Sequence, residues 1–161
     1  MNFLNIESDF IRSKALPDFE WTGFSEPTAP TPLNKPLQES KIALVVTAGA
    51  YLSGDQPRFD TRNPLGDDSF RIIPSDIAPD QIGLSHPGYD TKRARYDLDT
   101  VFPFQLLNHL QSIGVIGKVA PRHASFMGYI PRTERLLWNN APQVARMLRE
   151  DGVDLAILVP S

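Results

Sequence analysis

Two short clusters of polar side chains could do chemistry. The first, Ser85-His86-Pro87-Gly88-Tyr89-Asp90, places an imidazole, a phenol and a carboxylate within five positions. The second places Arg122 and His123 a few residues before a glycine turn. An imidazole can transfer a proton, and a guanidinium can hold a carboxylate. Each cluster alone is a weak signal, because a His before Pro-Gly is more often a turn residue than a catalyst.

Other polar motifs are equally ambiguous. Arg71 and the Gly66-Asp67-Asp68 turn could bind an anion, although surface pairing between them is the commoner outcome. The segment Thr47-Ala48-Gly49-Ala50 is too short for a dinucleotide fingerprint. With three histidines and no cysteine, a zinc site would need several carboxylates, so we expect no metal.

The elements that must position these clusters are predicted by apolar patterns. Residues 42–47 and 155–159 are typical of buried parallel strands, and shorter strands are predicted at 69–73, 81–85 and 115–120. Helices are predicted at 103–114 and 140–152, the second starting at a capping box formed by Asn140 and Gln143. The side chains expected to be buried are Leu106, Leu107, Leu110 and Ile113 in the first helix and Val144, Met147 and Leu148 in the second.

A strand, a long helical connection and a second apolar strand imply a right-handed parallel crossover. We therefore predict an α/β fold, with a mostly parallel open sheet and flanking helices, in which Gly49 and Ser161 meet at one edge. Loop residues converge at the carboxyl ends of such strands, so we expect both polar clusters to gather there.

The chain is expected to comprise a proline-rich N-terminal arm at residues 1–40 and one α/β domain at 41–161. Residues 5–14 can form a short helix, after which four prolines between residues 27 and 36 favour an extended arm. The 16 Lys and Arg against 19 Asp and Glu provide no basic surface for nucleic acid. No apolar run is long enough for a membrane span and no signal-peptide pattern is present, so we expect a cytoplasmic protein.

Six separated motifs, taken together and in order, resemble the glycine/sarcosine/betaine reductase selenoprotein B family, which includes the selenocysteine subunit of D-proline reductase. They are Val46 to Gly49, Gly66 to Pro74, His86 to Asp90, Asp97 to Pro103, Ile116 to Gly128 and Val153 to Pro160. The resemblance covers about Lys41 to Ser161 and leaves the arm outside. The family more often has Asn where this chain has Asp99, and frequently a second His where Gly88 stands. These departures concern the substrate more than the fold.

The resemblance implies the N-terminal part of a selenocysteine-dependent oxidoreductase. In the family, the strand matching Val153 to Pro160 leads into a selenocysteine or cysteine. Because UGA encodes selenocysteine and is ordinarily read as a stop, we expect UGA after the Ser161 codon and no redox nucleophile within this chain. The implied reaction is reductive C–N cleavage of a small amine or amino acid. A pyruvoyl group on a partner subunit holds the amine, and a thiol reductant is left as a disulfide.

Within that scheme the candidate residues have expected roles. Arg71 or Arg122 would hold a substrate carboxylate, and His86 or His123 would move a proton to the departing amine. The catalytic candidates are His86, Asp90 and His123, and the substrate-binding candidates are Thr47, Gly49, Arg71, Tyr89 and Arg122. No cofactor is expected within the chain itself.

Two other interpretations remain open. One is a non-catalytic subunit that binds substrate or docks to reductase partners through the arm. The other is an unrelated α/β small-molecule binding module, in which the motifs serve loop packing. The nucleotide sequence after the Ser161 codon would separate these interpretations from the first.

Overall fold

The computed structural model describes residues 3–14, 17–20, 29 and 31–161. The chain divides into two compact units, Met1–Pro32 and Leu33–Ser161. In the first unit, helix α1 (Phe3–Lys14) corresponds to the short helix predicted from the sequence. Pro27 and Pro30 lie outside the described residues, so the extended arm predicted there stays a prediction.

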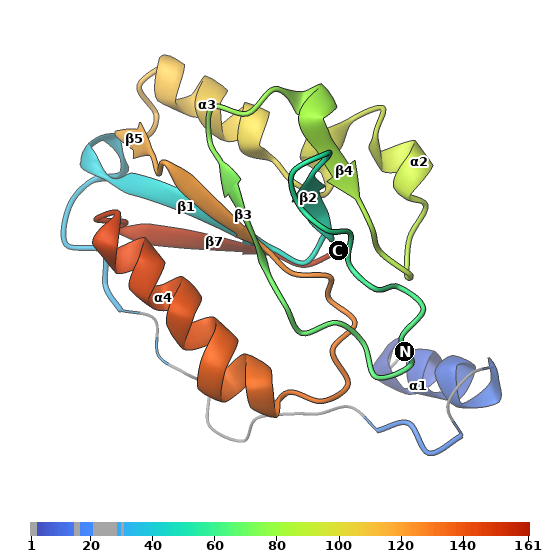
Figure 1. Cartoon of the computed structure of the whole chain (residues 1–161). Helices are drawn as coiled ribbons and strands as arrows, with labels where there is room; N and C mark the ends of the chain where they lie inside the picture. Colours follow the sequence, from blue (N-terminus) through green and yellow to red (C-terminus); the bar gives the residue numbers. More distant parts are fainter. Residues whose placement is uncertain (1–2, 15–16, 21–28, 30) are drawn as a thin grey trace. The chain divides into compact units, whose positions relative to one another are not determined.

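The second unit is built on a five-stranded sheet (Figure 1). Strand β1 (Lys41–Val46) pairs in parallel with β5 (Lys118–Val119), β6 (Arg122–Ser125) and β7 (Leu155–Val159). β5 and β6 follow one another along one side of β1, and β7 occupies the other side. β3 (Arg71–Pro74) extends the sheet antiparallel to β6. The predicted α/β architecture with a mostly parallel sheet is confirmed.

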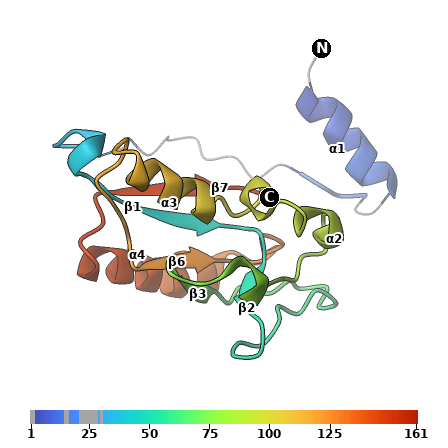
Figure 2. The same ribbon diagram turned by 90° about the horizontal axis from the view of Figure 1, so that it is seen from above.

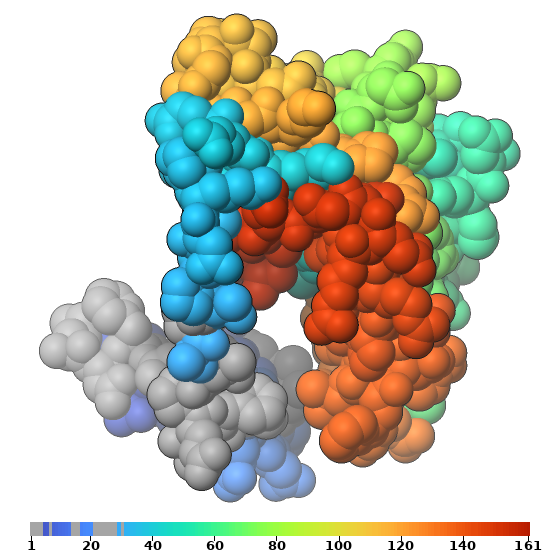
Figure 3. Space-filling view, turned by 90° about the vertical axis from the view of Figure 1, so that its left-hand side faces the viewer, coloured from blue at the N-terminus to red at the C-terminus, as the bar shows by residue number. Residues whose placement is uncertain are grey.

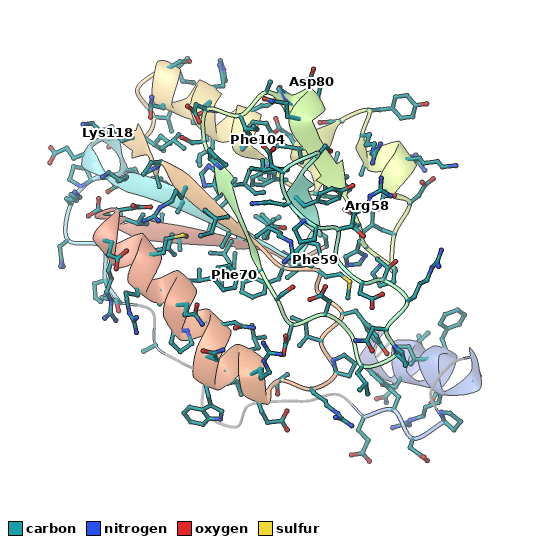
Figure 4. All side chains as sticks on the ribbon, in the orientation of Figure 1. Arg58, Phe59, Phe70, Asp80, Phe104 and Lys118 are labelled. Carbon is teal, nitrogen blue, oxygen red and sulfur yellow. The ribbon has the colours of Figure 1, made fainter. Side chains whose placement is uncertain are left out.

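Helices cover both faces of this sheet (Figure 2). Helix α3 (Phe104–Ser112) packs on one face and α4 (Ala141–Glu150) packs on the other. Figure 4 shows Phe104 on the α3 side of the sheet and Phe70 on the α4 side, where it contacts Phe126 with 5.7 Å between ring centroids. Two apolar cores therefore hold the sheet from opposite sides.

A second, two-stranded antiparallel sheet joins β2 (Ala50–Leu52) to β4 (Ile82–Leu84). The strand predicted at 81–85 is β4, whereas the sequence patterns missed β2. The shorter elements are η1 (Leu37–Glu39), η2 (Pro79–Gln81), α2 (Thr91–Ala94), η3 (Leu98–Thr100) and the π-helical turn η4 (Leu136–Asn140). This small sheet leads directly into the first polar cluster.

The two long apolar strands lie side by side, as predicted. β1 and β7 are parallel, with residues 42–46 in register with 155–159. The expectation that both are buried is wrong for β7, in which Ile157 is 38% exposed and Leu158 is 72% exposed. The reason is position: within the described residues β7 pairs with β1 alone and forms an edge of the sheet.

The first predicted helix is present but is turned differently from the expectation. Phe104 and Leu107 are buried and Leu110 is partly buried, whereas Leu106 is 49% exposed and Ile113 is 58% exposed. The aromatic ring of Phe104, which stacks on Phe102, points into the core, and the leucines that follow at three-residue spacing share its face. The predicted buried face is therefore wrong at its two outer positions.

In α4, Val144 and Met147 are buried and Leu148 is partly buried, as predicted. The predicted capping box is wrong. The turn η4 runs straight into α4, so Asn140 has helical dihedral angles rather than the extended conformation of an N-cap. Its side-chain amide instead donates to the carbonyl of Asp68 at 2.6 Å, which ties α4 to the loop before β3.

The side chain of Asp99, which lies in η3 before the helix, caps the N-terminus of α3. Its carboxylate accepts hydrogen bonds from the backbone N–H groups of Gln105 at 3.1 Å and Leu106 at 3.0 Å. The residue at this position, where the resembled family more often has Asn, therefore contacts a helix end, and its bearing on the substrate stays a prediction. Asparagine can accept one of the same hydrogen bonds.

We expect Asp99→Ala to lower the free energy of unfolding by about 1 kcal/mol, because α3 loses its N-terminal hydrogen-bond acceptor. Asp99→Asn, the matched control, should lower the free energy of unfolding by only a few tenths of a kcal/mol. Urea unfolding followed by circular dichroism measures both variants. Equal losses in the two variants would contradict the capping role.

Candidate functional site

The carboxyl ends of β1 and β7 meet at one edge of the sheet. The Thr47 backbone N–H donates to the carbonyl of Val159 at 3.0 Å, and Ser161 N–H donates to Thr47 Oγ1 at 2.8 Å. Gly49, two residues beyond Thr47, begins the turn into β2. The predicted meeting of the segments around Gly49 and Ser161 is thus present, and Thr47 joins them through its hydroxyl.

Gly49 connects this edge to the first polar cluster. Its N–H donates to the carbonyl of Phe126 at 2.7 Å, and its own carbonyl accepts from Ser85 N–H at 2.9 Å. The residue has a φ of +65°, and a Cβ placed on it would lie 2.1 Å from the Ser85 carbonyl oxygen. Only glycine fits this position, so its observed part in the site is to bring chain segments together.

His86 is held in one orientation by its own loop. The backbone N–H of Gly88 donates to His86 Nδ1 at 2.9 Å, and the imidazole packs on the Tyr89 ring with 4.5 Å between centroids. Tyr89 is fixed in turn, since its hydroxyl donates to the carbonyl of Ala48 at 2.7 Å. Because Nδ1 accepts a hydrogen bond, the proton of the neutral imidazole is assigned to Nε2.

Burial sets the charge of these two rings. It lowers the pKa of His86, and it raises the pKa of the Tyr89 phenol to about 12. Tyr89 is therefore a neutral hydrogen-bond donor, and His86 favours its neutral form at physiological pH. The pair presents a neutral imidazole, with an N–H group at Nε2, to the carboxyl edge of the sheet.

Gly128 leaves room in front of His86. It has a φ of +90°, and a Cβ at this position would lie 3.2 Å from His86 Nε2 and 3.1 Å from Thr47. Any side chain here would crowd the nitrogen atom that carries the proton. In the glycine turn that follows Arg122 and His123, Gly128 therefore keeps space open beside His86 Nε2.

Two hollows border Ser161. One, of about 490 Å³, is lined by His86, Gly88, Gly128, Tyr129 and the segment 61–64. The other, of about 680 Å³, is lined by Tyr89, Asp90, Arg93, Tyr96 and neighbouring residues of α2 and η3. Both volumes lie in the range of small-molecule sites, roughly 300 to 1,000 Å³. We name them the His86 hollow and the Tyr89 hollow.

Asp90 lines the Tyr89 hollow but already has a structural role. Its Oδ1 accepts hydrogen bonds from the N–H groups of Lys92 at 3.0 Å and Arg93 at 3.3 Å, so it is the N-cap of α2. The first polar cluster therefore gathers at the carboxyl edge as predicted, with His86 on one hollow and Asp90 on the other.

The second cluster does not join it. Arg122 begins β6, which runs parallel to β1, so its side chain lies at the opposite, amino edge of the sheet. There its guanidinium donates to both carboxylate oxygens of Asp151, at 2.9 and 2.7 Å. Figure 3 shows this side of the molecule, where the chain before β1 lies against the end of α4 and the start of β7. The expectation that Arg122 lies near the end of β7 is wrong.

The same expectation placed His123 at the carboxyl edge of the sheet, and this is also wrong. Its side chain is fully buried within the sheet, where Nδ1 accepts a hydrogen bond from the Leu44 backbone N–H at 3.1 Å. Phe102 packs edge to face on it, and burial lowers the pKa of His123 to about 4. The imidazole stands at the gap between β5 and β6, where β1 has no backbone partner for this N–H. Its observed role is structural.

Arg71 stays on the carboxyl side of the sheet, but its donors are in use. The guanidinium donates to the carbonyls of Pro57 and Phe70 and to Ser69 Oγ, and it lies 4.2 Å from the Phe59 ring centroid. Figure 4 labels Phe59 in the loop that this arginine secures. The arrangement makes Arg71 a clamp for residues 57–59, which competes with binding of a substrate carboxylate.

Segment 61–64, which lines the His86 hollow, was not among the site residues expected from the sequence. Its residues, Thr61-Arg62-Asn63-Pro64, resemble an ordinary polar turn. No short-range signal connects this turn to His86, some twenty-four residues later in the chain.

In the part of the chain that the structure describes, no three His, Asp or Glu side chains are grouped as metal ligands. Nor does any described helix have the length and apolar character needed to cross a bilayer.

Comparisons with known proteins give a consistent result. D-proline reductase subunit gamma of Acetoanaerobium sticklandii is 34% identical over 151 residues, which are 94% of this chain and 61% of that protein. Glycine reductase complex component B subunit gamma is 28% identical over 80% of this chain in Carboxydothermus hydrogenoformans, and 30% identical over 56% of it in Symbiobacterium thermophilum. The matches cover 30% and 21% of those two proteins. No solved structure matches the chain significantly.

The family described as glycine/sarcosine/betaine reductase selenoprotein B matches residues 17–161. The match begins well before Lys41, so the expectation that residues 1–40 lie wholly outside the resemblance is wrong. The matched range contains the sheet, both hollows and the His86 loop. The chain belongs to the glycine/sarcosine/betaine reductase selenoprotein B family.

Proposed function

We propose that this chain is the N-terminal part of a selenocysteine-dependent reductase that cleaves a C–N bond in a small amine or amino acid. The observation that carries the proposal is the family match over residues 17–161. The 34% identity to D-proline reductase subunit gamma, of which the chain spans 61%, supports it.

The redox residue would follow Ser161, at the carboxyl end of β7. The surroundings fit a chalcogen anion there. Thr47 Oγ1 holds the Ser161 backbone at 2.8 Å, and hollows on either side border Ser161. His86 lines one of them with its Nε2 proton available. A selenolate or thiolate at this position would attack the substrate carbon, and the C–N bond would break with departure of the amine. One thiol would then attack the chalcogen and release the reduced product, and a second thiol would free the selenolate or thiolate, which leaves the two thiols as a disulfide.

The residues of this chain would hold the substrate and guide its protons. His86 Nε2–H is the proposed donor to the departing nitrogen or to the chalcogen anion. Protonation at Nδ1 would break the hydrogen bond from Gly88, which favours the neutral imidazole. Tyr89 fixes the ring orientation, and Asp90 positions the adjacent α2 segment. Arg122 and His123 have no part in this scheme, because they lie away from the edge.

The proposed partners are other subunits of a reductase complex, among them a pyruvoyl-bearing subunit that holds the substrate amine, and a thiol reductant. The three relatives are named as subunits, and two are named as parts of a component B, which supports assembly with other chains. Glycine, sarcosine, betaine and D-proline are the substrates to test first.

The coding sequence and an activity assay test this proposal together. We expect the full-length protein to have selenocysteine or cysteine at the position that follows β7. The 161-residue chain should show no turnover of the four substrates with a dithiol reductant. The extended chain with selenocysteine at that position should show turnover in its complex, a cysteine variant should show less, and a serine variant should show none.

Two outcomes would contradict the proposal. A full-length protein with neither selenocysteine nor cysteine at that position would favour the non-catalytic subunit. Turnover by the 161-residue chain itself would show that the nucleophile lies elsewhere.

A further inference from the structure

The His86 hollow contains an arginine with no assigned partner. Arg62 lines this hollow of about 490 Å³ together with His86 and Gly128. Its side chain is exposed, and among the described residues its guanidinium makes no hydrogen bond and no ion pair. A guanidinium without such partners, on a residue that lines a hollow of this size, is available for an anionic ligand.

The backbone around Arg62 is held firmly. Its N–H donates to Asp60 Oδ1 at 3.1 Å, and Asn63 Oδ1 accepts from Leu65 N–H at 3.0 Å. The carbonyl of Asn63 accepts from Gly66 N–H at 2.9 Å. These bonds use the Asp60 carboxylate and the Asn63 amide for the turn, and leave the guanidinium of Arg62 free to meet a ligand.

The two arginines expected from the sequence to hold a carboxylate are occupied. Arg71 donates to three carbonyls and to Ser69 Oγ, and Arg122 donates to both oxygens of Asp151 at the other edge of the sheet. Arg93 lines the Tyr89 hollow, which His86 does not line. Arg62 is the arginine that shares a hollow with His86.

We infer that Arg62 is the residue that binds the carboxylate of the substrate in the His86 hollow, so that the site prefers an acid to its amide. The inference rests on the proposed function. The planar guanidinium can donate two parallel hydrogen bonds to a carboxylate, while His86 Nε2–H faces the same space. An amide of the same acid keeps the amine and the shape but loses the negative charge.

The test compares D-proline with D-prolinamide, and glycine with glycinamide, as ligands of the full 161-residue chain. The readout is the NMR signal of the His86 imidazole during titration. Wild-type protein should bind each acid more tightly than its amide. Arg62→Gln should weaken acid binding about 10- to 100-fold and leave amide binding unchanged, because it removes charge-assisted hydrogen bonds. Arg62→Lys should retain part of the preference.

Arg93→Gln is the matched control, since it removes the same group from the other hollow. It should leave both affinities unchanged. If Arg62→Gln keeps the preference for the acid, or if the wild-type protein binds acid and amide equally, the role of Arg62 is wrong. The proposed substrate site at His86 is not contradicted by either result. If the wild-type protein binds none of the four ligands, both the proposed substrate site at His86 and the role of Arg62 are wrong.

Discussion

Replacing His123 with alanine is expected to lower the free energy of unfolding by about 4 kcal/mol, a large part of the 5 to 15 kcal/mol typical of a domain. The imidazole is fully buried against Phe102, so its removal leaves a cavity in the sheet. It also leaves the Leu44 N–H, which donates to Nδ1 at 3.1 Å, without an acceptor. Urea unfolding measures the loss.

Two further variants separate these causes. His109→Ala removes the same group from an exposed position of α3 and should cost less than about 0.5 kcal/mol. His123→Gln keeps an oxygen that can accept from Leu44 N–H and should cost less than His123→Ala. If the alanine variants at 109 and 123 are equally stable, the structural role of His123 is wrong.

His123 also predicts a pH dependence. Burial lowers its pKa to about 4 from the ordinary value of 6.5. The folded protein keeps the imidazole neutral, whereas the unfolded chain takes up a proton below pH 6.5. The free energy of unfolding should therefore fall by about 3 kcal/mol as the pH drops from 6.5 to 4. His123→Gln should lack this component, which chemical unfolding at several pH values can measure. An equal pH dependence in both proteins would contradict the buried neutral imidazole.

The sequence was sufficient to predict the parallel pair β1 and β7, because continuous apolar runs joined by helices have few other arrangements. It was not sufficient to predict the positions of Arg122 and His123, which were expected in a loop after a strand at 115–120. That strand is interrupted instead, as β5 at 118–119 and β6 at 122–125. The carboxyl edge therefore comes after Ser125, and the residues taken for a loop lie inside the sheet.

The candidate site shows the same division between local and long-range information. The His86 cluster was predicted because its residues are adjacent in the chain and follow a strand. The place of Arg62 beside the His86 hollow depends on how residues 57–71 fold back, which is secured by Arg71 and by Asn140 in η4. Contacts of this kind between distant segments leave no periodic pattern in the sequence, so they become visible only in the folded chain.

Gly49→Ala is the substitution expected to damage both the fold and the site. A Cβ at Gly49 would lie 2.1 Å from the Ser85 carbonyl oxygen, and the φ of +65° is itself unfavourable for alanine. We expect a loss of more than about 3 kcal/mol in the free energy of unfolding. Gly54→Ala is the matched control, because Gly54 also has a positive φ, of +94°, but no atom lies within 4 Å of its Cβ position. It should lose only about 1 to 2 kcal/mol.

The difference between the two glycine variants isolates the close contact that holds the His86 loop against the sheet. Relief of the clash in Gly49→Ala would move Ser85 away from Gly49, and His86 would move with it from its place beside Gly128. In the folded fraction of Gly49→Ala, the His86 pKa should therefore rise toward its ordinary value, since the lowering comes from burial. In Gly54→Ala it should stay lowered. An NMR titration of the imidazole checks this, and an unchanged His86 pKa in Gly49→Ala would show that the loop is held at the edge by contacts other than Gly49.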